Sequence, residues 1–346
     1  MNTSKLVTLN EVCGCCEETL AGENEPLLAL RLEPKAFVPS YIYVRPKAEP
    51  KINVLEGSAY IDFPVNRTEI HEDYRRNPVE LQKILSTIDA VRNDADTRII
   101  ALSIKGYASP ESPYSNNERL AKGRTQTLKE YVQRQYNFPE SIISTDYEPE
   151  DWAGLERAVE NSDLQNRDAI LALIRSNMEP DAKEWKIKKT YPADYSWLLK
   201  NIYPGLRHSD YAVKYEVRAY TDVEEIKRLI KTQPQKLSLN EMYLAAQEME
   251  TGSEEYNETF DIAVRMFPDD EVANLNAANI AMSRGGLKSA ERYLQKAGDS
   301  PQAIYARATL AALNKDFDTA KKMFEEAARK GMPDAEKMLR QIEEIK

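Results

Sequence analysis

The chain has 346 residues, of which 42% are apolar and 30% charged, a balance typical of two or three globular domains that excludes wholesale disorder. Its 57 acidic and 47 basic side chains leave a net charge of −10, so we expect no nucleic-acid partner. No apolar run approaches the roughly 20 residues of a membrane-spanning helix, and we therefore expect no transmembrane segment.

The N-terminus shows no basic region followed by an apolar stretch, so no signal peptide is visible. This leaves either a cytoplasmic protein or a chain whose export signal has been removed. The cysteines Cys13, Cys15 and Cys16 fall in the motif CGCC, while the histidines, His71 and His208, are distant. A zinc site needs a second Cys or His pair, and adjacent cysteines bridge poorly. We therefore predict neither a metal site nor a cofactor, and interpret CGCC as a loop left from an upstream segment.

Residues 1–50 contain two runs rich in strand-forming residues, PLLALRL and FVPSYIYVRP. Pro39 and Pro46 interrupt the second run, which favours pairing at the edge of a sheet. Two short strands cannot bury a core alone. Residues 1–50 are therefore predicted to be a β-rich N-terminal segment, either the end of an upstream domain or strands added to the next one.

Strand and helix patterns alternate over residues 51–221. We predict four strands, at residues 58–63, 98–105, 140–147 and 210–220. One helix is predicted to begin at Asn77, as its N-cap, with Pro78 at the first helical position; a second covers residues 116–136. The alternation predicts an α+β fold in which the helices pack against one sheet.

About 60 residues separate the third and fourth predicted strands. Such a length is too great for a structureless loop, and helical patterns recur within it. We predict a helical insertion at about residues 149–205. Its tryptophans, Trp152, Trp185 and Trp197, are predicted to cover an edge or end of the sheet.

Residues 222–346 are predicted to be helical, with a break at Pro234, and contain an internal repeat. The repeated positions are Tyr256, Phe260 and Ala263, then Ala290, Leu294 and Ala297, then Ala320, Phe324 and Ala327. The second set follows the first by 34 residues and the third follows the second by 30. This spacing resembles tetratricopeptide (TPR) repeats, which implies helix pairs stacked into a solenoid that binds a protein partner. An unrelated helical bundle is the alternative.

The most informative segment runs from Ile104 to Val132. The pattern G-[HY]-x-[DS] at a strand end is matched by Gly106, Tyr107, Ala108 and Ser109. The pattern N-x-x-L-[SA]-x-x-R-[AT] at the start of the next helix is matched by Asn117, Leu120, Ala121, Arg124 and Thr125. Together they resemble the C-terminal domain of OmpA-like outer-membrane proteins over roughly residues 57–220, apart from the insertion. The variant GYASPE…NNERLAKGR is also similar to OmpA-like envelope proteins of the Bacteroidales that are often linked to fimbrial gene clusters.

The resemblance implies non-covalent binding to the diaminopimelate-type stem peptide of peptidoglycan. In that family a strand-end aspartate holds the ammonium of diaminopimelate and a helix arginine holds its carboxylate. Arg124 matches the arginine, but Ser109 replaces the aspartate, so the ammonium loses its charged partner. Glu111 would restore the charge if the loop folds inward. Asn117 completes the candidate ligand-binding set, with a turn-organising role as its alternative, and Arg124 has a surface ion pair as its alternative.

Enzymatic signatures are absent from the sequence, including phosphate-binding loops, dinucleotide fingerprints, zinc-protease motifs and nucleophile elbows. We therefore predict no catalytic residues and no enzyme. The resemblance implies a cell-envelope binding protein on the periplasmic side of the outer membrane, whose TPR-like repeats bind a protein partner and whose peptidoglycan site is weakened. The alternative is an envelope or fimbrial assembly scaffold that binds no peptidoglycan.

Overall fold

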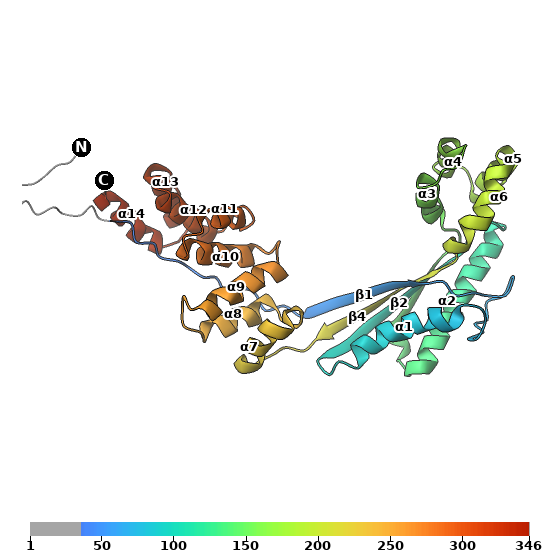
Figure 1. Cartoon of the computed structure of the whole chain (residues 1–346), viewed down its shortest axis with the longest axis horizontal. Helices are drawn as coiled ribbons and strands as arrows, with labels where there is room; N and C mark the ends of the chain where they lie inside the picture. Colours follow the sequence, from blue (N-terminus) through green and yellow to red (C-terminus); the bar gives the residue numbers. More distant parts are fainter. Residues whose placement is uncertain (1–35, 346) are drawn as a thin grey trace, which may run out of the picture. The chain divides into compact units, whose positions relative to one another are not determined.

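The computed structural model describes residues 36–345, which form two compact units (Figure 1). The sheet unit comprises residues 48–229 and 235–238. The helical unit comprises, within the described range, residues 36–47, 230–234 and 239–345. A single sheet with helices beside it confirms the predicted α+β class at this coarse level.

The sheet of the first unit has four strands in the order β1-β4-β2-β3. The strands are β1 (Lys51–Ala59), β2 (Thr97–Tyr107), β3 (Ile143–Glu148) and β4 (Ser209–Val217). Strands β2 and β3 are parallel, whereas β4 runs antiparallel to both β1 and β2. In the β2–β4 register Gly106 lies opposite Ser209, so the C-terminal end of β2 meets the start of β4.

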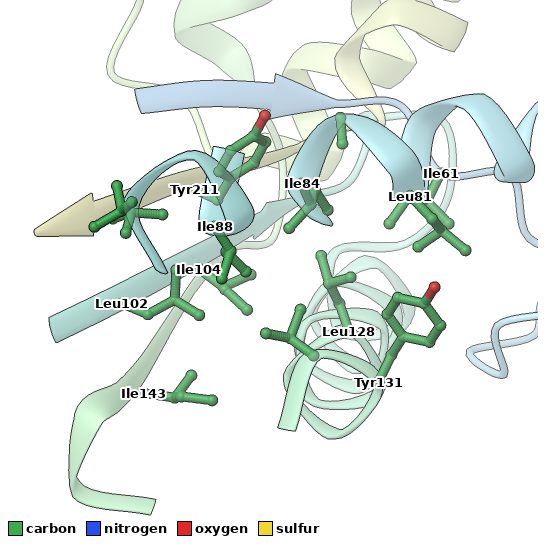
Figure 2. Close-up of a cluster of buried hydrophobic side chains, with 14 residues drawn as sticks. Ile61, Leu81, Ile84, Ile88, Leu102, Ile104, Leu128, Tyr131, Ile143 and Tyr211 are labelled. Carbon is green, nitrogen blue, oxygen red and sulfur yellow. The ribbon is translucent and has the colours of Figure 1, made fainter. Parts of the chain in front are cut away.

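One face of this sheet is buried under two helices, α1 (Asn77–Arg92) and α2 (Tyr114–Tyr136) (Figure 2). Alternate residues of β2 and β4 point into the core because side chains on a strand alternate between its faces. The labelled core residues are Ile61, Leu81, Ile84, Ile88, Leu102, Ile104, Leu128, Tyr131, Ile143 and Tyr211. Each fully buried leucine or isoleucine stabilises the fold by roughly 1.5–3 kcal/mol, so this cluster holds both helices on the sheet.

The first strand lies earlier than predicted: β1 covers Lys51–Ala59, and the expected strand at 58–63 is wrong beyond Ala59. Most of β1 is exposed, so the sequence carries no clear alternation there. Ile61 and Phe63, which gave the sequence its strand-like pattern, enter the core from the loop that follows β1.

Asn77 is not the N-cap of α1. The cap position is Arg76, without a side-chain bond, and Asn77 is buried in the first turn. Its amide oxygen accepts from the Asp62 nitrogen at 2.7 Å, and its amide nitrogen donates to the carbonyls of Asp62 and His71 at 2.9 and 2.8 Å. The side chain therefore satisfies loop backbone rather than helix backbone.

The helical insertion is present as predicted, as four helices with a core of their own. The helices are α3 (Trp152–Glu160), α4 (Arg167–Ile174), α5 (Pro180–Thr190) and α6 (Pro192–Asn201). Their shared core consists mainly of leucine, isoleucine and tyrosine side chains. Of the three tryptophans predicted to cover an edge or end of the sheet, Trp152 packs against this core and lines a cavity with Lys105 and Glu148 of β2 and β3. Trp185 and Trp197 are 57% and 41% exposed, and the prediction is wrong for these two.

Helix α7 (Val223–Thr232) carries the chain into the helical unit, where no strand occurs between residues 239 and 345. Its further helices are α8 (Leu239–Gln247), α9 (Glu254–Met266), α10 (Glu271–Ser283), α11 (Leu287–Leu294), α12 (Pro301–Leu313), α13 (Phe317–Arg329) and α14 (Asp334–Ile345). Each helix from α8 to α14 packs against the next along the chain. The repeated small and large residues identified in the sequence are buried between them.

The prediction of strands in the N-terminal segment is wrong for residues 36–50, which contain none. Residues 36–47 belong to the helical unit and pack along its helices in an extended conformation. The predictions for Cys13, Cys15, Cys16 and the run PLLALRL lie outside the described residues.

Asn77→Ala should lower the free energy of unfolding of the sheet unit by about 1–3 kcal/mol, because buried loop backbone groups lose their partners. All three tryptophans lie in this unit, so their emission during urea unfolding follows it selectively. Gln82→Ala, on the exposed side of the same helix, is the control and should change stability by less than about 0.5 kcal/mol. Equal losses in the two variants would contradict the assigned role.

Candidate functional site

The candidate site lies at the C-terminal end of β2, where the chain passes through a loop into α2. Three backbone hydrogen bonds fix this end. The Tyr107 nitrogen donates to the His208 carbonyl at 2.8 Å, and the Ala108 nitrogen donates to the Glu148 carbonyl at 3.3 Å. The Asp151 nitrogen in turn donates to the Ala108 carbonyl at 3.0 Å. The loop therefore lies against the end of β3 and the segment that precedes β4.

Two of the motif residues bring α2 close to β2. A side chain at Gly106 would collide with the Thr125 hydroxyl, which donates back to the Ala121 carbonyl at 2.8 Å. Only glycine at this strand position allows the helix so near. The contact places the neighbouring residue, Arg124, at the end of the strand.

Arg124 is held by two contacts on the sheet unit. Its Nε donates to the Arg67 carbonyl at 3.1 Å, and its guanidinium carbon lies 4.8 Å from the centre of the Phe63 ring. Within residues 36–345 no carboxylate forms an ion pair with it. Burial lowers the pKa of Arg124 to about 10; the charges of Arg207 and Arg119 act in the same direction, and the carboxylate of Glu111 acts against them.

Arg207 adds a second guanidinium to the site. Its Nη2 lies 3.4 Å from Glu111 Oε1, while its Nε is buried without a hydrogen-bond partner. Arg124 and Arg207 line one small pocket together with Ile61, Phe63, Gly106, Tyr107, His208 and Ser209. The loop thus folds inward as far as the arginines, and Glu111 reaches Arg207.

Ser109 and Asn117 are both buried, each with only 2% of its surface exposed. The amide nitrogen of Asn117 donates to the Ser112 carbonyl and to Glu150 Oε1, each at 2.8 Å, which uses both of its hydrogens. Burial raises the pKa of Glu150, although the bonds from Asn117 and Trp152 lower it in part. Asn117 therefore ties the loop to the end of β3, in agreement with the turn-organising alternative.

A larger cavity of about 390 Å³ adjoins the site and was not predicted from the sequence. It is lined by Lys105, Tyr107, Glu148, Glu150, Asp151, Trp152, Ala153, Arg157, His208 and Asp210. Tyr107 and His208 belong to both pockets, and their rings stack with centres 4.3 Å apart. His208 Nδ1 is buried without a hydrogen-bond partner. Acidic groups outnumber basic ones here, in contrast to the arginine pocket.

The comparisons with protein-family models and with curated proteins find no match for this chain. In residues 36–345 no helix combines the length and apolar character needed to cross a membrane. Over the same range, no three His, Cys, Asp or Glu side chains gather as a set that could hold a metal ion.

Asn117→Ala should destabilise the sheet unit, and more strongly at about pH 8 than at about pH 4.5. Burial raises the folded-state pKa of Glu150 above its unfolded value, so stability from the protonated carboxyl is lost as the pH rises through the folded pKa. Removing Asn117 takes away a donor that favours the ionised form, and therefore enlarges this loss. Urea unfolding followed by tryptophan emission at both pH values measures it.

The neighbouring Asn116→Ala is the matched control for this pH series. Asn116 accepts a bond from Arg119 at the surface and does not contact Glu150. Its small effect on stability should be independent of pH. A pH-independent loss in Asn117→Ala would show that the Glu150 bond has no part in the stability of the loop.

Proposed function

We propose that the chain is a non-catalytic binding protein of the cell envelope, whose sheet unit binds the stem peptide of peptidoglycan through Arg124. The observation that carries the proposal is the pairing of two guanidiniums, Arg124 and Arg207, in the lining of one pocket, where the carboxylate that contacts them is Glu111, 3.4 Å from Arg207. This pair occurs in a chain of net charge −10. A carboxylate ligand would complement it.

Guanidinium chemistry fits such a ligand. The planar fork of arginine binds a carboxylate through two parallel hydrogen bonds, which are stronger than neutral ones. Arg124 uses its Nε on the Arg67 carbonyl, which orients the rest of the group, and Arg207 has an Nε without a partner. Both features support the placement of one carboxylate of diaminopimelate between the two arginines.

The ammonium of the ligand is proposed to bind Ser109 and Glu111. A carboxylate bound by Arg207 would compete with Glu111 for that arginine and release Glu111 to receive the ammonium. Every charge then has a partner: the ligand carboxylate pairs with the arginines, and the ligand ammonium pairs with Glu111. Carboxylates such as Asp151 and Asp210 line the adjoining cavity, which shares Tyr107 and His208 with the arginine pocket, and extend the acidic surface.

On this proposal the sheet unit is an OmpA-like domain, the helical unit is a TPR-like array that binds a protein partner, and the protein lies on the periplasmic side of the outer membrane. Support comes from the motif residues Gly106, Thr125 and Arg124, which meet at one strand end as that motif requires. A scaffold without peptidoglycan binding is the second candidate, and the burial of an uncharged Ser109 favours it.

Arg124→Ala should reduce co-sedimentation with purified diaminopimelate-type peptidoglycan by roughly tenfold to a hundredfold in affinity, the effect of losing a charge-assisted bond. Arg134→Ala is the matched control, since Arg134 is exposed near the other end of the same helix. It removes the same charge and should leave sedimentation unchanged at moderate salt. Equal losses in both variants would indicate a general charge effect instead of a site.

Ser109→Asp should strengthen sedimentation, because it restores a charged acceptor for the ammonium. The position is buried, so circular dichroism must first show that the variant is folded. Glu111→Gln gives an independent measure, as it removes the other proposed ammonium partner and should weaken binding. A wild-type chain that does not sediment, together with a folded Ser109→Asp variant that does no better, would leave the scaffold candidate.

A further inference from the structure

The N-terminal part of the helical unit is an extended segment, residues 37–45, which we call the strap. It passes along the helices from α14 to α8, opposite to their order in the chain (Figure 1). It packs on three successive apolar clusters. Phe37 and Ile42 contact the cluster of α12 to α14, Tyr41 and Val44 that of α10 to α12, and Tyr43 that around α9.

Alternate helices supply the polar contacts to the strap. They come from α8, α10, α12 and α14, and most of them bind strap backbone. The contacts are Val38 N to Gln341 Oε1 at 3.1 Å, Tyr305 OH to Ser40 O at 3.1 Å, Asn279 Nδ2 to Ile42 O at 2.8 Å, Asn276 with both N and O of Val44 at 2.8 Å, and Arg45 Nε to Asn240 Oδ1 at 3.1 Å.

Asn276 and Asn279 are the centre of this arrangement. Both are almost fully buried on one side of α10, three residues apart, and both donate to strap carbonyls. Asn276 also accepts from the Val44 nitrogen, so its amide pairs with both the N–H and the C=O of one residue, as a residue on a neighbouring antiparallel strand would. An amide that binds backbone in this way recognises an extended chain whatever its side chains are.

The helix surface under the strap accommodates aromatic side chains. The Tyr43 ring lies 5.7 Å from the ring centre of Tyr256 and 5.4 Å from that of Phe260. Burial among these rings raises the pKa of the Tyr43 hydroxyl. Yet every residue from Phe37 to Val44 keeps part of its surface exposed, whereas Asn276, Asn279 and Tyr305, which bind it from the helices, are almost fully buried. The strap therefore covers apolar and amide groups of the helices and itself stays half exposed along its length.

We propose that this face of the helical unit is a binding site for an extended, aromatic-rich peptide, and that the strap occupies it as an intramolecular ligand. The inference rests on the proposed partner binding by the helical unit and identifies the partner: a segment of another protein that is extended, carries aromatic and β-branched residues, and displaces residues 37–45. It does not depend on the Arg124 site. Pro39 within the strap and Pro46 after it limit regular strand pairing, which favours a segment bound by side-chain amides.

The test uses the full chain and a fluorescein-labelled synthetic peptide with the sequence of residues 36–47. In the wild-type chain the strap competes for the site at high effective concentration, so the peptide should bind weakly. The double variant Tyr41→Ser/Tyr43→Ser weakens the strap but leaves the helices unchanged. Fluorescence anisotropy should show binding to this variant about tenfold or more tighter than to wild type.

Asparagine variants in the same background show whether the peptide uses the strap's site. Asn276→Ala/Asn279→Ala should abolish peptide binding. Asn274→Ala is the matched control, because Asn274 is equally buried on α10 but binds the carbonyls of Pro268 and Asp270. Its variant should retain binding, and an equal loss in Asn274→Ala would overturn the assignment of the site.

A second measurement covers the case in which the strap variant does not fold. Residues 47–50 are exposed and precede β1, so a specific protease site that replaces them allows the strap to be cut from the rest of the chain. The labelled peptide should then replace the cleaved strap within hours, seen by gel filtration. If the folded protein binds no peptide in both experiments, the proposal is wrong. The effect of Arg124→Ala on peptidoglycan binding is independent of this result.

Discussion

The close approach of α2 to β2 at Gly106 is the contact on which the candidate site depends. The Thr125 side chain occupies the space that any larger residue at position 106 would need. Because the helix is held there, Arg124 lies at the end of the strand, beside a pocket that it shares with Arg207. The apolar core under α1 and α2 supplies the energy that holds the helix on the sheet, and glycine sets how near it comes.

Buried asparagine amides perform the same task in both units. Where the chain is extended or turns outside a helix or sheet, its N–H and C=O groups lack the hydrogen-bond partners that helices and sheets provide. They need other partners when they are buried. Asn77 supplies them for the loop after β1, Asn117 for the loop before α2, and Asn276 and Asn279 for the strap. An amide carries both a donor and an acceptor, so a single side chain can pair with a backbone N–H and a backbone C=O without adding charge.

These asparagines also explain which parts of the fold could be predicted from the sequence. Strand β2 and helix α2 were predictable, because their periodic apolar residues face the core and depend only on local spacing. Asn77 carries every local sign of an N-cap, and only the tertiary structure directs its amide to Asp62 instead. The strap has the composition of a strand, yet its partners are side chains more than 190 residues away in sequence.

The candidate site also contains residues that the sequence identifies and residues that it does not. Arg124 was identified through a motif confined to one loop and one helix, whose residues are close in the sequence. Arg207 and His208 were missed because they precede β4, and only the antiparallel pairing of β4 with β2 brings them to the end of β2. No periodicity or short motif in a single sequence reports that pairing.

Competition with the strap also sets the affinity that a partner protein needs for this site. A tethered ligand acts at an effective concentration on the order of millimolar, so a partner present at about 1 μM needs roughly a thousandfold higher affinity to occupy half of the sites. The half-buried side chains of the strap make that advantage attainable, since a longer segment gains further apolar and backbone contacts along α8 to α14. A partner concentrated at the same surface needs a smaller advantage. If the sheet unit anchors the chain to the cell wall, that anchoring raises the local concentration of any partner held there, and the first proposed site then favours occupation of the second.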